Sequence, residues 1–218
     1  MIENLWRIFN GRISYIQCDV SVPQEFEMCL TTAKALHGHI DVLINNAGIL
    51  NEVHWSRMID VNLKGAINGI RLGLKFMSKL SGGRGGKIIN LSSAAGVKPC
   101  PGIPAYSATK AGILAYVHSL QGTEDFEENG VLISSICPTT TDTNMVRNLK
   151  RSDLEFEDFM LILMDQKEEG LQHVDRIAGK IAEMLQDMDN FKTKVGLCTP
   201  GDFHVYNPFC TGYGCHDS

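Results

Sequence analysis

Tyr106 and Lys110 are the pair of side chains whose spacing points most directly to chemistry. They lie four residues apart in a stretch that predicts a helix, so both project from one helix face. An ammonium group on that face favours the ionised form of a nearby phenol and so lowers its pKa. Ser93 ends an apolar stretch before this helix, and its hydroxyl can share a substrate oxygen. These side chains together indicate proton transfer to or from an alcohol or a carbonyl.

Short apolar segments alternate with longer amphipathic ones, which predicts an α/β fold with a doubly wound parallel sheet. We expect strands at residues 13–17, 40–44, 87–91, 131–136 and 195–198. We expect helical segments at residues 3–9, 21–37, 55–80, 106–127, 153–164 and 173–186. Ligands of such sheets bind beyond the carboxyl ends of the strands. Asp19, Asn46, Ser93 and Pro138 each follow a predicted strand and therefore belong to the candidate site.

Each candidate also has a purely structural interpretation. The Tyr-x-x-x-Lys spacing arises by chance in many proteins, and Ser92 and Ser93 can simply end a strand. Asn46 can belong to a turn, because Asn and Gly both tolerate positive φ. Asn62, an amide inside a predicted helix, can mark a kink, and Asp19 can cap the helix that follows it. The order in which these residues follow successive strand ends favours the functional interpretation.

Composition narrows the class of protein. The 218 residues carry a net charge of −5 and no stretch rich in lysine and arginine, which disfavours nucleic acid as a partner. No apolar run approaches membrane-spanning length, and we expect one domain over residues 1–218. The seven cysteines are spread singly, which is typical of a reducing compartment and predicts a cytoplasmic protein. Cys210, Cys215 and His216 near the chain end are too few ligands to favour a metal site.

The chain resembles the short-chain dehydrogenases/reductases. The motifs of that family are matched in order by Asn-Asn-Ala-Gly at residues 45–48, by Asn62, by Ser93 and by the run from Tyr106 to Lys110. The resemblance covers residues 13–145 closely. It implies a Rossmann-like doubly wound parallel sheet and the activity of an NAD(P)-dependent alcohol dehydrogenase.

The resemblance also implies a role for each matched side chain. Tyr106 would be the general base in alcohol oxidation and the acid in reduction, with its pKa lowered by Lys110 and by the oxidised nicotinamide. Ser93 would hold the substrate oxygen, and Lys110 would also hold the nicotinamide ribose. Asn62 would hold a water that relays protons from Lys110. Hydride would pass directly between the carbinol carbon and the nicotinamide.

The cofactor implied by the resemblance is NAD, with NADP as an open alternative. The matched positions divide into an adenine turn at Asp19 and Val20, an adenosine-ribose contact at Asn46, and a nicotinamide loop with Pro138, Thr141 and Thr143. Tyr106 and Lys110 complete this set on the side of the nicotinamide.

The substrate is expected to be a lipophilic secondary alcohol or ketone. The lid region of the family corresponds to an apolar segment with Phe156, Phe159, Met160, Leu163 and Met164. Ordinary core or dimer packing explains that segment equally well. Ile103 replaces a polar residue that orients the substrate in the subgroup this chain most resembles, which favours a more apolar alcohol. We expect a homodimer.

The opening segment of the family has no counterpart in this sequence. That segment comprises two strands and a Thr-Gly-x-x-x-Gly-x-Gly turn, whose backbone N–H groups bind the cofactor diphosphate. We therefore expect a truncated sheet, weakened NAD binding, an exposed apolar edge at residues 42–44 and marginal stability. The alternative function is a catalytically silent interaction protein that dimerises through its two long helices.

Overall fold

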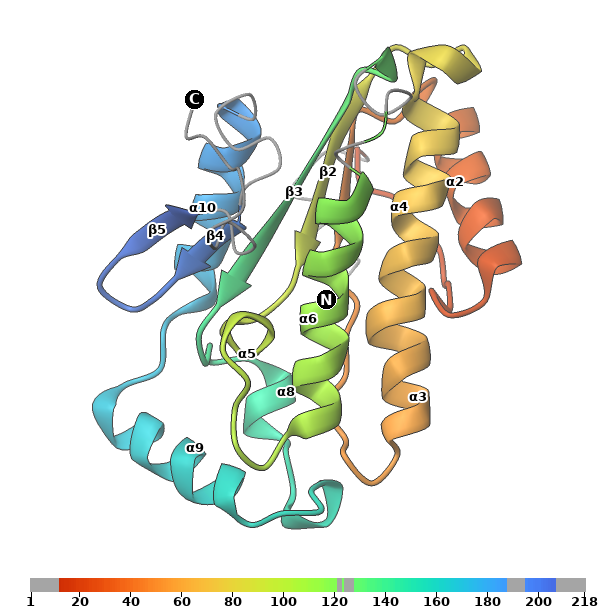
Figure 1. Cartoon of the computed structure of the whole chain (residues 1–218). Helices are drawn as coiled ribbons and strands as arrows, with labels where there is room; N and C mark the ends of the chain where they lie inside the picture. The colour runs from red at the N-terminus through yellow and green to blue at the C-terminus, as the bar shows by residue number, and fades with distance from the viewer. Residues whose placement is uncertain (1–11, 121–122, 124–127, 188–194, 207–218) are drawn as a thin grey trace.

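The computed structural model describes residues 12–120, 123, 128–187 and 195–206 (Figure 1). Three expectations lie outside these residues: the helix at residues 3–9, the end of the helix expected to reach residue 127, and the candidate metal ligands Cys210, Cys215 and His216. Within the described part, no group of three or more His, Cys, Asp and Glu side chains is arranged to bind a metal ion.

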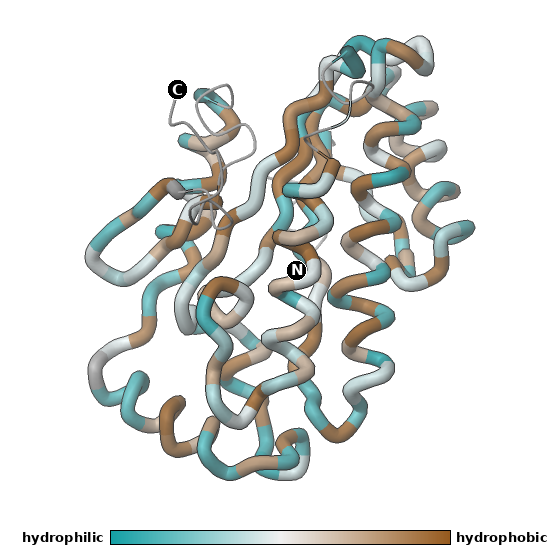
Figure 2. The backbone as a smooth tube through the Cα atoms, in the orientation of Figure 1, coloured by the Kyte–Doolittle hydropathy of each residue, from teal (hydrophilic) through white to brown (hydrophobic). Residues whose placement is uncertain are grey.

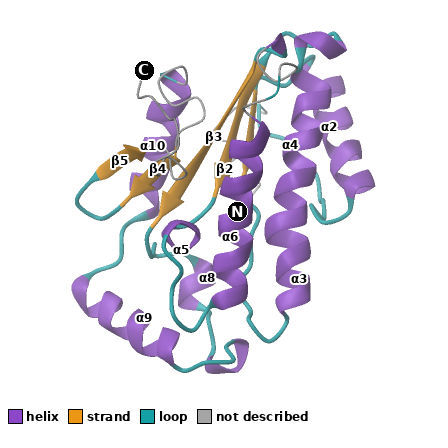
Figure 3. Cartoon of the chain, viewed as in Figure 1, coloured by secondary structure: helices purple, strands orange, loops and turns teal. Residues whose placement is uncertain are grey.

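The described strands form one sheet in the order β1-β2-β3-β4-β5 (Figure 3). Their bounds are Val42–Asn45 for β1, Gly86–Leu91 for β2, Val131–Pro138 for β3, Val195–Cys198 for β4 and Phe203–Tyr206 for β5. The first four strands are parallel, and β5 runs antiparallel to β4. The predicted α/β class with a mostly parallel sheet is therefore confirmed.

The described α-helices are α2 (Pro23–His37), α3 (Trp55–Ile59), α4 (Gly65–Met77), α5 (Ala94–Val97), α6 (Pro104–Leu120), α8 (Asn144–Arg147), α9 (Asp158–Glu169) and α10 (Val174–Gln186). Short 3₁₀ turns lie at Lys79–Ser81 and Arg151–Asp153. A π-helical segment, Asp60–Lys64, joins α3 to α4 without a break. The helix predicted at residues 55–80 is thus present, with a wider turn in its first half.

Helices cover both faces of the sheet, and the core lies between these layers (Figure 1). On one face Ile70 of α4 packs with Ile88 of β2, and α6 contributes Val117. On the other face Met184 of α10 packs with Ile89 of β2. Ile88 and Ile89 are consecutive and point to opposite faces, as the pleat of a strand requires. Figure 2 shows the apolar character of the central strands β2 and β3.

The two outer parts of the sheet differ from the prediction. Residues 13–17 form no strand, because a strand needs a partner for its backbone groups and no described segment pairs with these residues. In β1, Val42 and Ile44 are 41% and 42% exposed, so the predicted exposed apolar edge is confirmed. The unpredicted β5 packs Phe203 over Gly196 of β4, where a Cβ atom would lie 2.5 Å from the phenylalanine ring.

The exposed edge at β1 gives a first testable prediction. Val42→Lys places a charge on the outermost described strand, and a charged edge opposes pairing with the strands of other molecules. We expect less aggregation on heating, measured by light scattering, with the midpoint of unfolding nearly unchanged. Val53→Lys is the matched control, because Val53 is 47% exposed and lies away from the strand. Equal aggregation of the two variants would contradict the prediction.

Candidate active site

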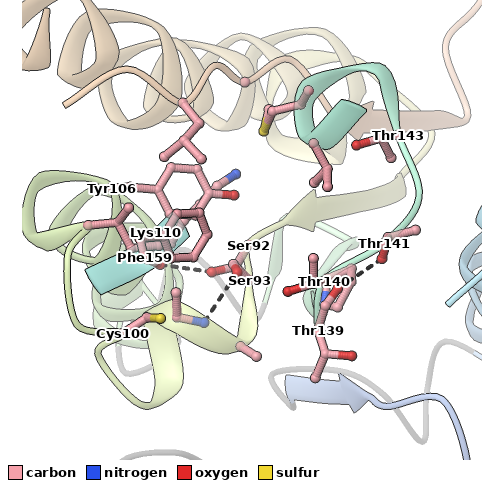
Figure 4. Close-up of a pocket in the computed structure, with 18 of the residues that line it drawn as sticks. Ser92, Ser93, Cys100, Tyr106, Lys110, Thr139, Thr140, Thr141, Thr143 and Phe159 are labelled. Atoms are coloured by element: carbon pink, nitrogen blue, oxygen red, sulfur yellow. Dashed lines mark hydrogen bonds between the residues drawn. The ribbon is translucent and has the colours of Figure 1, made fainter. Parts of the chain in front are cut away.

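A cavity of about 460 Å³ lies at the carboxyl ends of β2 and β3, against α6 and α9 (Figure 4). In Figure 4 Tyr106, Lys110 and Ser93 line one side, and the threonines that follow β3 line the other. The structure brings eight of the predicted site residues to this cavity: Asn46, Ser93, Ile103, Tyr106, Lys110, Pro138, Thr141 and Thr143. Parallel strands bring these residues together because their carboxyl ends share one edge of the sheet.

Tyr106 is half-buried and projects from the first turn of α6 toward Ser93. Removal of its phenol from water raises the pKa of Tyr106 to about 12, although a hydrogen bond with the Ser93 side chain acts in the opposite direction. Desolvation disfavours the charged phenolate, and here it exceeds the effect of the neighbouring donor. The expected lowering of this pKa by Lys110 is therefore not present in the chain alone. The raised pKa of Tyr106 favours the protonated phenol at neutral pH.

Lys110 is buried one helical turn after Tyr106. Its Nζ donates a hydrogen bond of 2.8 Å to the carbonyl of Leu91, and it lies 5.6 Å from the centre of the Tyr106 ring. Burial lowers the pKa of Lys110 to about 8. An ammonium group has three donor hydrogens, so two remain for a ligand in the cavity. Lys110 thus bridges the end of β2 and the face of α6 that carries the phenol.

Two serines follow β2 and have different roles in the structure. Ser92 is buried, and its hydroxyl donates a 2.8 Å hydrogen bond to the backbone carbonyl of Lys110, which fixes α6 to the sheet. Ser93 precedes α5, and its hydroxyl oxygen accepts a 3.2 Å hydrogen bond from the Ala95 N–H. Ser93 lines the cavity beside Tyr106. Ser92 therefore packs α6 against the end of the strand, whereas the Ser93 side chain lies at the cavity.

Asn62 lies just behind the cavity, inside the π-helical segment. Its side chain bonds twice with the backbone of Ile49, accepting from the N–H at 2.8 Å and donating to the carbonyl at 2.8 Å. A π-helical turn frequently occurs at functional sites, because it shifts one side chain out of the regular helical position. Gly48 separates the amide from Lys110, since a Cβ atom there would lie 3.5 Å from Asn62 Oδ1 and 3.6 Å from Lys110 Nζ. The amide therefore holds the loop that follows β1.

The loop after β3 is held from behind by Gln172, a residue that the sequence did not single out. Gln172 is buried, and its Nε2 donates to the Thr139 hydroxyl at 2.9 Å and to the carbonyl of Cys198 at 3.0 Å. Its backbone also bridges to Thr141. Its position 33 residues after the loop gives no local sequence signal for this contact. Gln172 thereby fixes the loop with Pro138, Thr141 and Thr143 to β4.

Asp19 and Val20 lie apart from the main cavity. Val20 lines a second cavity of about 50 Å³, and Asn46 borders both cavities. The Asp19 carboxylate accepts from the Ser21 N–H at 3.0 Å, from the Ser21 hydroxyl at 2.7 Å and from Arg57 at 2.6 Å. The line from Thr143 through Asn46 to Val20 therefore follows one rim of the sheet, the direction in which an extended dinucleotide would lie.

The contacts of Asp19 predict a dependence of stability on pH. The hydrogen bonds from Ser21, followed by the one from Arg57, lower the pKa of Asp19 from 3.8 to about 2. Because the folded-state pKa is depressed, this contribution to stability is complete above about pH 4 and is lost as the pH falls toward 2. We expect Asp19→Asn to lower the free energy of unfolding at pH 7, with the difference from the parent chain vanishing near pH 2.

Denaturant unfolding at several pH values measures this difference. Ser21→Ala and Arg57→Met each remove a side-chain hydrogen bond to the Asp19 carboxylate, whereas the contact from the Ser21 N–H remains in both variants. Each variant should therefore remove part of the pH dependence, and less of it than Asp19→Asn removes. A pH dependence unchanged in both variants, or an Asp19→Asn difference that persists at pH 2, would contradict the assignment.

One wall of the cavity is apolar. Ile103 and Phe159 are buried and line it, and Ile162 adds to this wall from α9. In the apolar segment predicted as a lid or as packing, Leu163 lies in the core, whereas Phe156 and Met164 are exposed. The lid role of this segment stays a prediction. Among the described helices none has the length and apolar character needed to cross a bilayer.

The family model described as short chain dehydrogenase matches residues 1–154 of the chain. With the parallel sheet and the cavity at its carboxyl edge, this match defines the class: the chain belongs to the short-chain dehydrogenase family. The solved structure of Thermoplasma acidophilum aldohexose dehydrogenase, in ligand-free form, superposes with a TM-score of 0.70 at 23% identity. That superposition covers 87% of this chain and 78% of the other, and it supports the fold alone.

Particular relatives are similar at the level of sequence. The chain is 33% identical to the NAD(+)-type 15-hydroxyprostaglandin dehydrogenase of Mus musculus over 178 residues, which is 79% of this chain and 65% of the relative. The Homo sapiens protein of the same name is 33% identical, with 66% of its length matched. Alcohol dehydrogenase 1 of Ceratitis capitata is 34% identical over 63% of this chain and 54% of the relative. The chain thus spans about two-thirds of the length of the two mammalian relatives and 54% of the length of the Ceratitis relative.

Proposed function

We propose that the protein is an oxidoreductase that interconverts a secondary alcohol and a ketone with a nicotinamide cofactor, NAD in preference to NADP. The observation that carries the proposal is the meeting of Ser93, Tyr106 and Lys110 at one cavity that also has an apolar wall. Proton exchange with an alcohol needs a positioned acid or base, and a hydroxyl nearby fixes the substrate oxygen. The names of the relatives, which include NAD(+)-dependent and alcohol dehydrogenases, support the same class of reaction.

The described residues fit the nicotinamide and its ribose better than they fit the diphosphate of the cofactor. Lys110, Thr141 and Thr143 offer donors around the cavity, and this donor set suits a ribose and a carboxamide. When bound, the oxidised cofactor would accept the hydride and its positive charge would lower the pKa of Tyr106. The described residues include no glycine-rich turn that could bind a diphosphate, which supports weakened cofactor binding by this chain.

Each side chain then has a defined task in the proposed reaction. Tyr106 takes the hydroxyl proton of the alcohol in oxidation and returns it in reduction. Ser93 holds the same oxygen, and Lys110 stabilises the phenolate while holding the ribose. Asn62 keeps the loop after β1 in place and holds a water through which Lys110 exchanges protons with solvent. Asp19, Val20 and Asn46 form the adenosine side, and Ile103 borders the substrate.

A lipophilic substrate follows from the apolar wall of the cavity. Ile103 and Phe159 line the cavity with apolar side chains, so polar groups of a substrate placed against them would lose their hydrogen bonds to water without replacement. We propose a lipophilic alcohol or ketone, a cytoplasmic location and a homodimer as the working form.

A catalytically silent interaction module is the second candidate. It is favoured by the exposed apolar residues Val42 and Ile44 of β1, since Ile44 borders the small cavity on the adenosine side. Because Ile44 is exposed at this small cavity, a site for the adenine ring there would be weak. In this alternative the protein dimerises through its long helices and carries no cofactor.

Binding of NADH to the purified chain separates the two candidates. An enzyme should enhance and shift the nicotinamide fluorescence, and it should reduce NAD in the presence of long-chain secondary alcohols. A weak but saturable signal is expected, because the described part lacks a diphosphate-binding turn. A chain that gives no fluorescence change at millimolar NADH and no turnover would be the silent module.

A further inference from the structure

Glu52 is a buried carboxylate that the proposed reaction does not use. It is 1% exposed and lies in the segment between β1 and α3. One carboxylate oxygen accepts a hydrogen bond of 2.8 Å from the Tyr106 N–H, and the other accepts one of 3.0 Å from the Ala105 N–H. Burying a charge is costly unless it is hydrogen-bonded, so these two contacts account for its position.

The beginning of α6 explains why these contacts are needed. The helix starts at Pro104, which has no N–H, and the preceding Ile103 has no side-chain acceptor to serve as a cap. The Ser107 N–H donates to the carbonyl of Ile103 at 3.0 Å. The N–H groups of Ala105 and Tyr106 would otherwise be unpaired, as at any helix N-terminus. Glu52 satisfies both, and its negative charge complements the positive end of the helix dipole.

Glu52 also connects α6 to the other walls of the cavity. Its own N–H donates to the carbonyl of Asp153 at 2.7 Å, in the turn that precedes α9. The adjacent Asn51 donates from its side chain to the Asp153 carboxylate at 3.1 Å. The first turn of α6 is therefore held by the Glu52 carboxylate, and the approach to α9 is held by the Glu52 N–H and the Asn51 side chain of the same loop.

We infer that Glu52 is a positioning residue for Tyr106: it fixes the first turn of α6 so that the phenol stays within reach of Ser93 and the substrate oxygen. The inference rests on the proposed oxidoreductase function. Glu52 accepts a hydrogen bond from the backbone of Tyr106, the third residue of the helix. Loss of this hydrogen bond therefore tilts or unwinds the turn that carries the phenol. A displacement of about 1 Å is enough to cost about a hundredfold in rate.

Glu52→Gln tests the inference with little change in shape. The amide keeps one acceptor oxygen, but its NH₂ group faces a backbone N–H, so one of the two contacts is lost. We expect kcat for oxidation of a secondary alcohol to fall about 10- to 100-fold. The KM values for NAD and for the alcohol should change less than threefold. The deuterium isotope effect on kcat, with deuterium at the carbinol carbon, should rise, because a misplaced base makes the chemical step more rate-limiting.

A stability control separates positioning from general destabilisation. Met184→Ala removes a fully buried side chain on α10, on the face of the sheet opposite α6. It should lower the midpoint of thermal unfolding while leaving the isotope effect and both KM values unchanged. If Glu52→Gln behaves like Met184→Ala, with fewer folded molecules but the parental isotope effect, the inference is overturned.

Two further outcomes are distinguishable. If Glu52→Gln does not fold, Glu52→Asp keeps the charge and shortens its reach by one methylene, and the same loss in kcat is expected. If neither variant folds, Glu52 is required for folding and the positioning role is overturned. A parent chain that neither binds NADH nor turns over overturns the proposed function instead, before any variant is compared.

Discussion

Tyr106→Phe should abolish alcohol oxidation while leaving the fold intact. The substitution removes only the phenol oxygen, which faces the cavity and Ser93 rather than the core. Loss of a general acid or base costs about 10²- to 10⁴-fold in kcat. The measurement is the formation of reduced nicotinamide from NAD and a secondary alcohol, with circular dichroism as the check on folding. NADH binding should persist, because the phenol is only one of several contacts around the cofactor.

Tyr116→Phe is the matched control. Tyr116 lies ten residues later on α6 and packs against the core between α4, α6 and the sheet, away from the cavity. It should retain the parental kcat. Equal activity of the Tyr106 variant and the parent chain would overturn the assignment of the phenol.

A comparison of the parent chain with Tyr106→Phe also reports the titration of the phenol. Burial raises the pKa of Tyr106 from 10.0 to about 12, so the parent chain should show a phenol that ionises near pH 12 and is absent from Tyr106→Phe. Ultraviolet absorbance follows this ionisation. Because the folded-state pKa is raised, the associated stability is complete below about pH 10 and is lost as the pH rises toward 12.

Gly96→Ala should both destabilise the protein and impair the site. Gly96 lies in α5, where a Cβ atom would stand 2.7 Å from the carbonyl carbon of Lys110 and 2.9 Å from the Ala111 nitrogen. These are backbone atoms of α6, so no side-chain rotation relieves the overlap. Overpacking of this kind costs about 1–3 kcal/mol, and the shift of α6 displaces Lys110 from the Leu91 carbonyl. We expect about a hundredfold loss in kcat with this displacement.

Gly179→Ala is the control for adding a methyl group to a helical glycine. Gly179 is exposed on α10, and a Cβ atom there meets nothing within 4 Å. Alanine has the higher helix propensity by about 0.8–1 kcal/mol, so this variant should be more stable with unchanged activity. Thermal unfolding and the oxidation assay, measured on both variants, test the pair. A Gly96→Ala protein as stable as the parent would show that α5 can move away from α6.

The sequence alone determined the class of fold and which polar side chains meet at the cavity. Apolar strands alternating with amphipathic helices predict the parallel sheet, and Ser93, Tyr106 and Lys110 share a cavity because the carboxyl ends of β2 and β3 lie side by side. These signals are local: the period of apolar residues, a four-residue spacing and the position after a strand. The exposed side chains of Val42 and Ile44 in β1 agree with the apolar edge expected at residues 42–44.

Tertiary structure decided what sequence patterns could not. Glu52 reaches the N–H groups of α6 more than fifty residues away, and Gln172 holds the loop after β3 from 33 residues away. No local period encodes such contacts, because they depend on which segments the folded chain brings together. The expected lowering of the Tyr106 pKa by Lys110 and the oxidised nicotinamide concerns the cofactor-bound site. In the chain alone, desolvation of the phenol raises this pKa, and no sequence pattern shows desolvation. The spacing of Tyr106 and Lys110 places both side chains on one helix face, and only the packing around them sets their protonation.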